Sequence, residues 1–447
     1  MDSALLSTHW RTLKRKSAII WRNSISKNTK KNEKLFSRKS WKIICCSGTA
    51  STNSWNSKKL LQEMAGLAMI IYIAFLSVIF GLLLFELVAT WKMSYNGNLS
   101  LDKGSFVEPS PLAEGAAQHS PQKTDGSYTV TLILAWTVIF LFSSLRYNVG
   151  WDYEAYYATV RYNLVTNIVS NGELATIFLI ELARDMNMTN LYFFLNSLIF
   201  ITLVALTVKR YSQDYWISII FFVCFPLFFL NSLSVIRLFT ALAITFYAFK
   251  FIERGQLLRY LIAVALAGMF HASAFIAIAF YFIRNVKLDI VKLVLVLLAL
   301  PFVGRAINSF IVAYLPTYAP YTEAAGGQEG TKAIFVLLFI GIAALFFRDR
   351  ILENDRIANM YFNFYFVGLG IYLMFFSQGT MGHRLSLYGT FFSLLLIPKI
   401  VSLFNLDSNR VLLKVGISLF SIVIFLYIVY VGSATYVPYK TIFQIRY

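Results

Sequence analysis

A short polar stretch, RYNVGWDYEAYY at residues 146–157, holds the residue types best suited to chemistry. It follows the apolar run 129–145 directly and contains an arginine, two carboxylates and four tyrosines. Aromatic residues commonly collect at a membrane–water boundary, so an aromatic belt is the simplest interpretation. A belt requires neither Arg146 nor Asp152, and charged groups at membrane depth are usually functional. We therefore interpret the stretch as a functional loop in which Gly150 permits a tight turn.

Three more polar points interrupt apolar sequence further along the chain. Arg237 follows NSLSVI and opens an apolar segment, His271 stands within FHAS, and Arg384 lies within GHRLSLY. Glu173 lies in the amphipathic region that follows the first loop. An arginine at a helix end can also be a snorkelling side chain, and a lone histidine can be a core residue with satisfied hydrogen bonds. Ionisable groups in membrane segments nevertheless favour function.

These residue types indicate chemistry on a phosphorylated sugar. Arginine suits bidentate contact with a pyrophosphate, and a carboxylate such as Asp152 or Glu173 can activate a sugar hydroxyl. An arginine clamp can also stabilise the charge that develops on a leaving pyrophosphate. The chain has no phosphate-binding glycine-rich motif, which disfavours soluble nucleotide sugars as donors. A donor already in the membrane fits better.

The composition indicates how these residues must be positioned. Of 447 residues, 58% are hydrophobic and only 14% charged, which predicts an all-α, polytopic membrane protein. We expect about 12 transmembrane helices, some short or re-entrant. The expected ranges are 64–90, 129–145, 191–208, 215–233, 237–251, 258–270, 272–283, 288–303, 333–347, 361–376, 385–404 and 411–430. The pieces flanking His271 form either two half-helices or one long helix.

Charge and side-chain counts exclude several other classes of site. The net charge of +18 arises largely from residues that flank membrane segments, so we expect no nucleic-acid partner. Three cysteines and four scattered histidines predict neither a disulfide framework nor a zinc site. We expect no metal and no cofactor.

The basic residues also predict an orientation and three regions. Basic clusters at alternate connections belong in the cytoplasm, which places the polar points 146–152, 237, 271 and 384 on the opposite face. The same counting would force the basic segment 1–63 across the membrane. Either 1–63 is a disordered extension from a misassigned start, with Met64 as the true start, or one of the later expected helices is wrong and the orientation reverses; we favour the first explanation, because 1–63 also lacks a foldable pattern. Residues 64–431 form the membrane domain, and 432–447 a short polar tail.

Several motifs together resemble the EpsG family of Wzy-like capsule and exopolysaccharide polymerases. LRYNVGWDYEAYY is similar to the family's loop, and SLSVIRLFTALAI, AGMFHASAFIAI and HRLSLY are similar to later family segments, in order and spacing, over about residues 64–430. Leu238 replaces the family's usual glutamine. The extension 1–63 and the loop 91–128 are atypical.

The resemblance implies a glycosyltransferase-type polymerase that joins undecaprenyl-pyrophosphate-linked repeat units for capsule, exopolysaccharide or O-antigen. It would work on the outer face of the bacterial cytoplasmic membrane, among membrane lipids, and could act with a chain-length regulator and a flippase. Asp152, Glu173 and His271 are the expected catalytic residues. The residues expected to bind substrate are Arg146, Tyr153, Arg237, Arg384 and Tyr388. The alternatives are a lipid-linked oligosaccharide flippase or exporter, and a membrane acyltransferase that uses His271.

Overall fold

The computed structural model describes residues 69–86, 88, 126–165, 168, 171–314, 333–353, 355–376, 380–404 and 407–444. They belong to one compact unit, Ala65–Tyr447. The expected extension 1–63 and most of the loop 91–128 lie outside the described residues.

The described residues are almost entirely helical, as the sequence predicts. The first described helix is Met69–Glu86. The elements that follow are α3 (Gly126–Ser144), β1 (Arg146–Tyr147), α4 (Tyr153–Tyr162), α6 (Leu174–Asp185), α7 (Thr189–Tyr211), α8 (Tyr215–Cys224), α9 (Phe229–Ser232), α10 (Ile236–Tyr247), α11 (Phe249–Glu253), α12 (Leu257–Gly268), the 3₁₀ helix η1 (Ala272–Ala277), α13 (Ile278–Ile283), α14 (Ile290–Tyr314), α16 (Ala333–Phe346), α17 (Arg348–Leu352), α18 (Arg356–Met374), α19 (Thr380–Thr390), α20 (Ser393–Ser402), α21 (Asp407–Val431), α22 (Ser433–Tyr436), β2 (Lys440–Thr441) and η4 (Ile442–Gln444).

The structure supports a multi-pass membrane protein, but the expected count of about 12 helices is not confirmed. Five described helices are long and apolar enough to span a membrane, and a sixth span results if α19 and α20, bent by 43°, count as one. Other apolar helices are shorter, partly because backbone breaks divide the expected segments. Phe225 is extended (φ −72°, ψ 125°) and ends α8. The following Pro226 favours that conformation in the residue before it.

His271 divides the chain into two short helical pieces, which is one of the two arrangements the sequence left open. α12 ends at Gly268 and η1 begins at Ala272. Between them His271 is extended, with φ −156° and ψ 122°. The histidine therefore stands at a helix break, where its side chain is not confined to a helix face.

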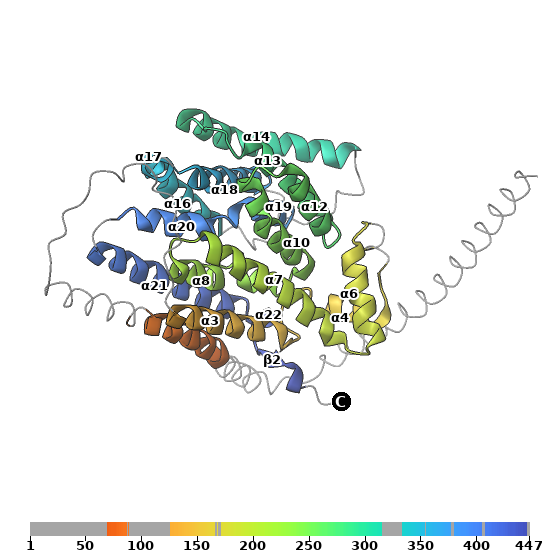
Figure 1. Cartoon of the computed structure of the whole chain (residues 1–447). Helices are drawn as coiled ribbons and strands as arrows, with labels where there is room; N and C mark the ends of the chain where they lie inside the picture. The colour runs from red at the N-terminus through yellow and green to blue at the C-terminus, as the bar shows by residue number, and fades with distance from the viewer. Residues whose placement is uncertain are drawn as a thin grey trace, which may run out of the picture. The chain divides into compact units, whose positions relative to one another are not determined.

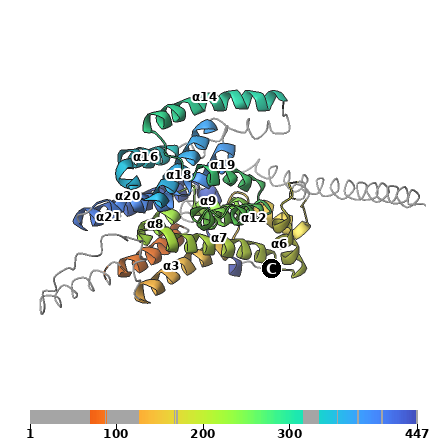
Figure 2. The same ribbon diagram turned by 45° about the horizontal axis from the view of Figure 1, so that its top comes forward.

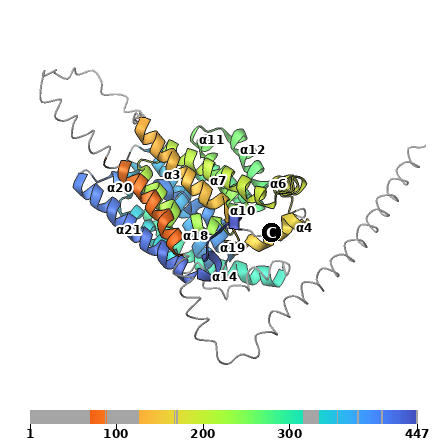
Figure 3. The same cartoon turned by 90° about the horizontal axis from the view of Figure 1, so that it is seen from below.

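α7 and α18 organise the packing. α7 lies against α3, α6 and α10, whereas α18 lies against α14, α16, α19 and α20. The first described helix and α3 lie side by side (Figures 1 and 3), and Phe75 stacks on Phe142 between them with ring centroids 4.0 Å apart. α14 lies at the edge of this group of helices (Figures 1 and 2). The core formed in this way is rich in aromatic residues.

The segment after α21 returns to the polar loop that follows α3. β2 pairs antiparallel with β1, with Arg146 opposite Thr441 and Tyr147 opposite Lys440. Tyr72 in the first described helix donates a hydrogen bond to the carbonyl of Tyr436 at 2.7 Å. Residues from both ends of the described chain therefore support the loop at 146–152.

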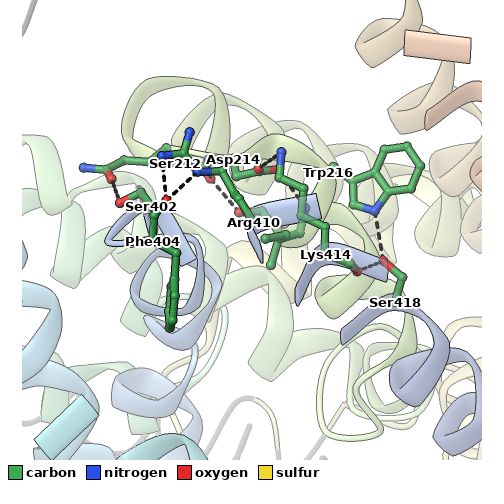
Figure 4. Close-up of polar contacts among 11 residues, drawn as sticks. Ser212, Asp214, Trp216, Ser402, Phe404, Arg410, Lys414 and Ser418 are labelled. Atoms are coloured by element: carbon green, nitrogen blue, oxygen red, sulfur yellow. Dashed lines mark hydrogen bonds and ion pairs between the residues drawn. The ribbon is translucent and has the colours of Figure 1, made fainter. Parts of the chain in front are cut away.

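A second polar cluster joins α21 to the α7–α8 connection and to the end of α20 (Figure 4). Asp214 forms an ion pair with Lys414, and Trp216 Nε1 donates a hydrogen bond to Ser418 Oγ at 2.9 Å. Arg410 Nη2 donates to the Phe404 carbonyl at 3.0 Å. Asp214 also caps α8, because its side chain accepts a hydrogen bond from the Ile217 N–H. We call this cluster the α21 clamp.

Candidate functional site

Glu173, Arg237 and His271 meet in one buried cluster. Glu173 lies directly before α6 and is 1% exposed, and its Oε2 forms an ion pair with Arg237 Nη1. Its Oε1 lies 3.5 Å from His271 Nδ1. Arg237 is the second residue of α10, at a helix end whose dipole favours anions. Two backbone hydrogen bonds, from Ala175 and Thr176 to the Met269 carbonyl, hold α6 beside the His271 break.

The cluster disfavours charge on the imidazole. Both Glu173 and His271 lie outside the candidate membrane spans. Burial, together with the positive charges of Arg237 and Arg384, lowers the pKa of His271 to about 4. Burial also raises the pKa of Glu173, and the nearby Arg237 opposes that shift. At neutral pH His271 is therefore uncharged, and its contact with Glu173 joins a neutral imidazole to a carboxylate instead of forming an ion pair.

The position of the proton on His271 determines which neighbour the ring contacts. Nδ1 lies 3.5 Å from the Ser273 N–H, which requires the nitrogen to accept. It is also 3.5 Å from Glu173 Oε1, which requires the nitrogen to donate. The Ala272 backbone N–H also stabilises the Glu173 carboxylate. A ring with the proton on Nδ1 would add a further donor to this carboxylate and leave Nε2 as a hydrogen-bond acceptor.

Asp152 and Arg384 form a second, more open pair beside this cluster. Arg384 Nη2 lies 3.8 Å from Asp152 Oδ2, and the two side chains are 36% and 40% exposed. Asp152 directly precedes α4, but its side chain does not cap that helix. Both residues, and Arg237, act electrostatically on the Tyr156 hydroxyl, so the two arginines and Asp152 surround one tyrosine. The two pairs thus form a single site.

Tyr388 joins α19 to the His271 break. Its hydroxyl shares a hydrogen bond of 3.0 Å with Ser273 Oγ, and its ring is buried. This bond fixes the helix that carries Arg384 next to the segment that carries His271. Tyr388 therefore lies at the site, with its hydroxyl as the polar group.

Gly150 shapes the loop that carries Asp152. Its φ of +109° lies in the region that favours glycine. A Cβ at this position would collide with the Leu233 carbonyl. The Gly150 N–H donates to the Thr435 carbonyl at 3.2 Å. The loop is therefore held between the turn before α10 and the segment after α21.

Arg146 and Tyr153 lie in the core, so the structure does not place these two expected substrate ligands at the site. Arg146 is 1% exposed, donates to the Ser143 carbonyl, and reaches the Leu233 carbonyl at 3.2 Å. Tyr153 is also 1% exposed and stacks on Phe193 with ring centroids 4.3 Å apart. Their positions are explained by the hydrogen-bonding needs of a buried backbone turn and by aromatic packing.

The described residues contain no group of three or more histidine, cysteine, aspartate or glutamate side chains that could hold a metal ion. The site brings together two guanidinium groups, two carboxylates, an uncharged imidazole and hydroxyl groups. Such a set can hold a polyanion and move a proton.

Comparison with known proteins places this site in a family. A family model described as the EpsG family matches residues 129–441. The chain belongs to the EpsG family. The resemblance inferred from the sequence is thereby confirmed, and the match includes all the site residues described above. No curated protein and no solved structure matches the chain.

Other residues of this EpsG-family site escaped the sequence analysis. Asn231 contacts His383, with Asn231 Nδ2 3.1 Å from His383 Nε2. Ser234 Oγ accepts a hydrogen bond from the Trp151 N–H at 3.0 Å. Tyr156 lies between the charged groups. Asn231 and Ser234 lie in the same short segment as Arg237, which is the only signal by which the sequence could have indicated them.

Proposed function

We propose that this EpsG-family protein is a polysaccharide polymerase of the Wzy-like glycosyltransferase type. It joins oligosaccharide repeat units carried on undecaprenyl pyrophosphate, on the extracytoplasmic face of the bacterial cytoplasmic membrane. The observation that carries this proposal is the convergence of Arg237 and Arg384, each held by a carboxylate, on one site with His271. The product would be a capsular polysaccharide, an exopolysaccharide or O-antigen.

Arg237 and Arg384 bind the pyrophosphate of the donor. Arg237 is held firmly by Glu173, and that buried contact fixes the direction of its guanidinium group. The contact between Arg384 and Asp152 is longer and exposed, so Arg384 can exchange its carboxylate for a phosphate at small cost. Together the two arginines stabilise the negative charge that the pyrophosphate gains as it leaves.

Asp152 is the general base, and Glu173 is the residue that orients the cluster. Asp152 is 40% exposed, whereas Glu173 is 1% exposed and already paired. In the transfer, an acceptor sugar hydroxyl attacks the anomeric carbon of the donor and gives its proton to the Asp152 carboxylate. The new carbon–oxygen bond forms as the bond between the anomeric carbon and the phosphate oxygen breaks. Undecaprenyl pyrophosphate departs with the electron pair of that bond.

His271 and Tyr388 position the substrates in this scheme. The uncharged imidazole can donate a hydrogen bond to, or accept one from, the pyrophosphate or the acceptor. Tyr388 holds Ser273 and thereby the His271 segment. Proton transfer to an optimally placed base contributes about 10²–10⁴-fold to the rate, so Asp152→Asn should lower elongation by a factor in that range.

Purified protein in nanodiscs, supplied with an undecaprenyl-pyrophosphate-linked repeat unit, tests the proposal. The wild type should produce a ladder of chain lengths without any other protein, and Asp152→Asn and Arg237→Ala should not. Asp349→Asn is the matched control, because Asp349 is 88% exposed and, within the described part of the chain, its one ion pair is with Arg348. A folded wild type that forms no ladder would refute the polymerase. Movement of the lipid-linked unit across the bilayer without elongation would instead support an exporter.

A further inference from the structure

The turn between α9 and α10 contacts the segments that carry Asp152 and Arg384 and leads into the helix that carries Arg237. It is built around the Asn231 carbonyl, which accepts hydrogen bonds of 3.0 Å from the N–H groups of both Ser234 and Val235. Leu233 and Ser234 are buried. The turn leads directly into α10, where Arg237 stands in the first helical turn.

One side of the turn fixes the loop that carries Asp152. Ser234 Oγ accepts the hydrogen bond from the Trp151 N–H, one residue before Asp152. The Leu233 carbonyl accepts a hydrogen bond from Arg146 and lies against Gly150. On this side, the loop that leads to Asp152 is held by contacts to the turn's backbone and to one hydroxyl group.

Another side of the turn fixes α19. Asn231 Nδ2 donates to His383 Nε2 at 3.1 Å and also lies 3.3 Å from the Leu227 carbonyl. His383 immediately precedes Arg384, whose guanidinium faces Asp152. The amide of Asn231 therefore ties the helix that carries Arg384 to the turn that carries Arg237.

We propose that the turn of residues 231–235 positions the pyrophosphate and base groups relative to one another. Asn231 fixes the position of Arg384 through its hydrogen bond to His383. Ser234 fixes the position of Asp152 through its hydrogen bond to the Trp151 backbone. Arg237 is attached to the turn directly. The positioning residues are therefore Asn231, Ser234 and His383. They keep the loop that carries Asp152 and the helix that carries Arg384 at a fixed distance from the start of α10. The inference rests on the proposed function, because it gives these residues a role in the same reaction.

The first test measures binding of inorganic pyrophosphate to purified protein by calorimetry. Asn231→Ala should weaken binding about tenfold, the loss expected for one misplaced charge-assisted contact. His383→Ala should weaken it by a similar factor. The double variant should bind no more weakly than either single variant, because both act through one bond. Wild-type affinity in Asn231→Ala, or losses that multiply in the double variant, would overturn the role assigned to Asn231.

Asn363→Ala is the matched control. Asn363 is a buried asparagine, and its Nδ2, like that of Asn231, donates to a backbone carbonyl, here those of Ile283 and Val286. Its removal should lower the melting temperature in detergent without changing the affinity for pyrophosphate. A loss of affinity in Asn363→Ala equal to that in Asn231→Ala would show that general destabilisation explains both, and would overturn the positioning role.

The second test separates Ser234 from Asn231. Ser234→Ala should lower kcat for elongation about tenfold and leave pyrophosphate affinity unchanged, because it displaces the base and not the arginines. Ser234→Thr, which keeps the hydroxyl group, should restore part of the rate. Equal loss in Ala and Thr variants, or a loss confined to KM, would overturn the role of Ser234. A wild type that is folded but does not elongate would refute the proposed function itself, which is a separate outcome.

Discussion

Glu173 and Arg237, 64 residues apart in the sequence, form a buried ion pair at the starts of α6 and α10. The carboxylate is 1% exposed and the guanidinium 22% exposed. A carboxylate this deeply buried requires a counter-charge, and the guanidinium supplies it. The pair thus gives Arg237 one fixed direction and stabilises the packing of α6.

Removing one member of this pair should destabilise the protein far more than removing both charges. Arg237→Gln leaves Glu173 without its counter-charge, at a cost of about 3–5 kcal/mol. The Glu173→Gln/Arg237→Gln double variant should recover most of the melting temperature in detergent but none of the elongation activity. A double variant as unstable as the single one would show that charge pairing does not stabilise this region.

Gly150→Ala should damage the site more than a matched glycine substitution. Gly172 has a similar backbone requirement, with φ +71°, but a Cβ there meets nothing within 4 Å. Gly172→Ala should therefore cost only the backbone strain, about 1–2 kcal/mol. Gly150→Ala adds the collision with the Leu233 carbonyl, which displaces Asp152. Melting temperatures and elongation rates of the two variants give the comparison, and equal effects would contradict it.

The stability of the protein should fall in acid partly because of His271. Its folded-state pKa of about 4 lies below the ordinary value of 6.5, so the unfolded chain binds the proton first between these values. The His271 contribution is therefore intact above pH 6.5 and is lost as the pH falls toward 4. Glu173, whose pKa is raised, acts in the opposite sense over an interval above 4.5.

Melting curves at pH 7.5 and 5.0 measure this effect. The wild type should lose more stability on acidification than His271→Asn, which keeps a donor near Glu173 but has no titrating ring. Both proteins keep Glu173, Arg237 and Arg384, the charged groups around the ring. Parallel acid losses in the two proteins would show that His271 does not titrate below its ordinary value.

The α21 clamp should affect stability without affecting catalysis. Asp214→Asn keeps the cap on α8 but removes the ion pair with Lys414, so the melting temperature should fall. Asp214→Ala should cost about 1 kcal/mol more, because the cap is lost as well. The elongation rate per folded molecule should match the wild type in both. A lower rate in Asp214→Asn would mean that the clamp is coupled to the site.

The sequence predicted the helical membrane class and singled out several residues that lie together in the structure, because apolar length and isolated charges are local signals. Arg237, His271 and Arg384 stand out in apolar sequence, and the structure brings them together. The sequence did not distinguish Arg146 from Arg384, because each stands at one end of an apolar run. Arg146 follows such a run, and Arg384 precedes one. Only the tertiary structure shows that Arg146 satisfies buried carbonyls while Arg384 stays half exposed.

The helix count and the positioning residues could not be predicted in the same way. The apolar length of a run of about 20 residues does not reveal a bend such as the one of 43° between α19 and α20. Asn231 and Ser234 are common polar residues whose role depends on distant partners. His383 lies 152 residues from Asn231, and Trp151 lies 83 residues from Ser234. Their hydrogen bonds are long-range contacts without a periodic signal.

The pairing of β2 with β1 has a consequence for how the protein is made. Thr435 and the strand Lys440–Thr441 are synthesised after every described membrane-spanning helix, yet they hold Gly150 and Arg146 in place. A nascent chain that has inserted all those helices therefore still lacks the support that fixes Asp152. The loop that carries Asp152 can therefore gain these contacts only after residues 435–441 have been synthesised, so a chain that stops before them leaves this loop without that support.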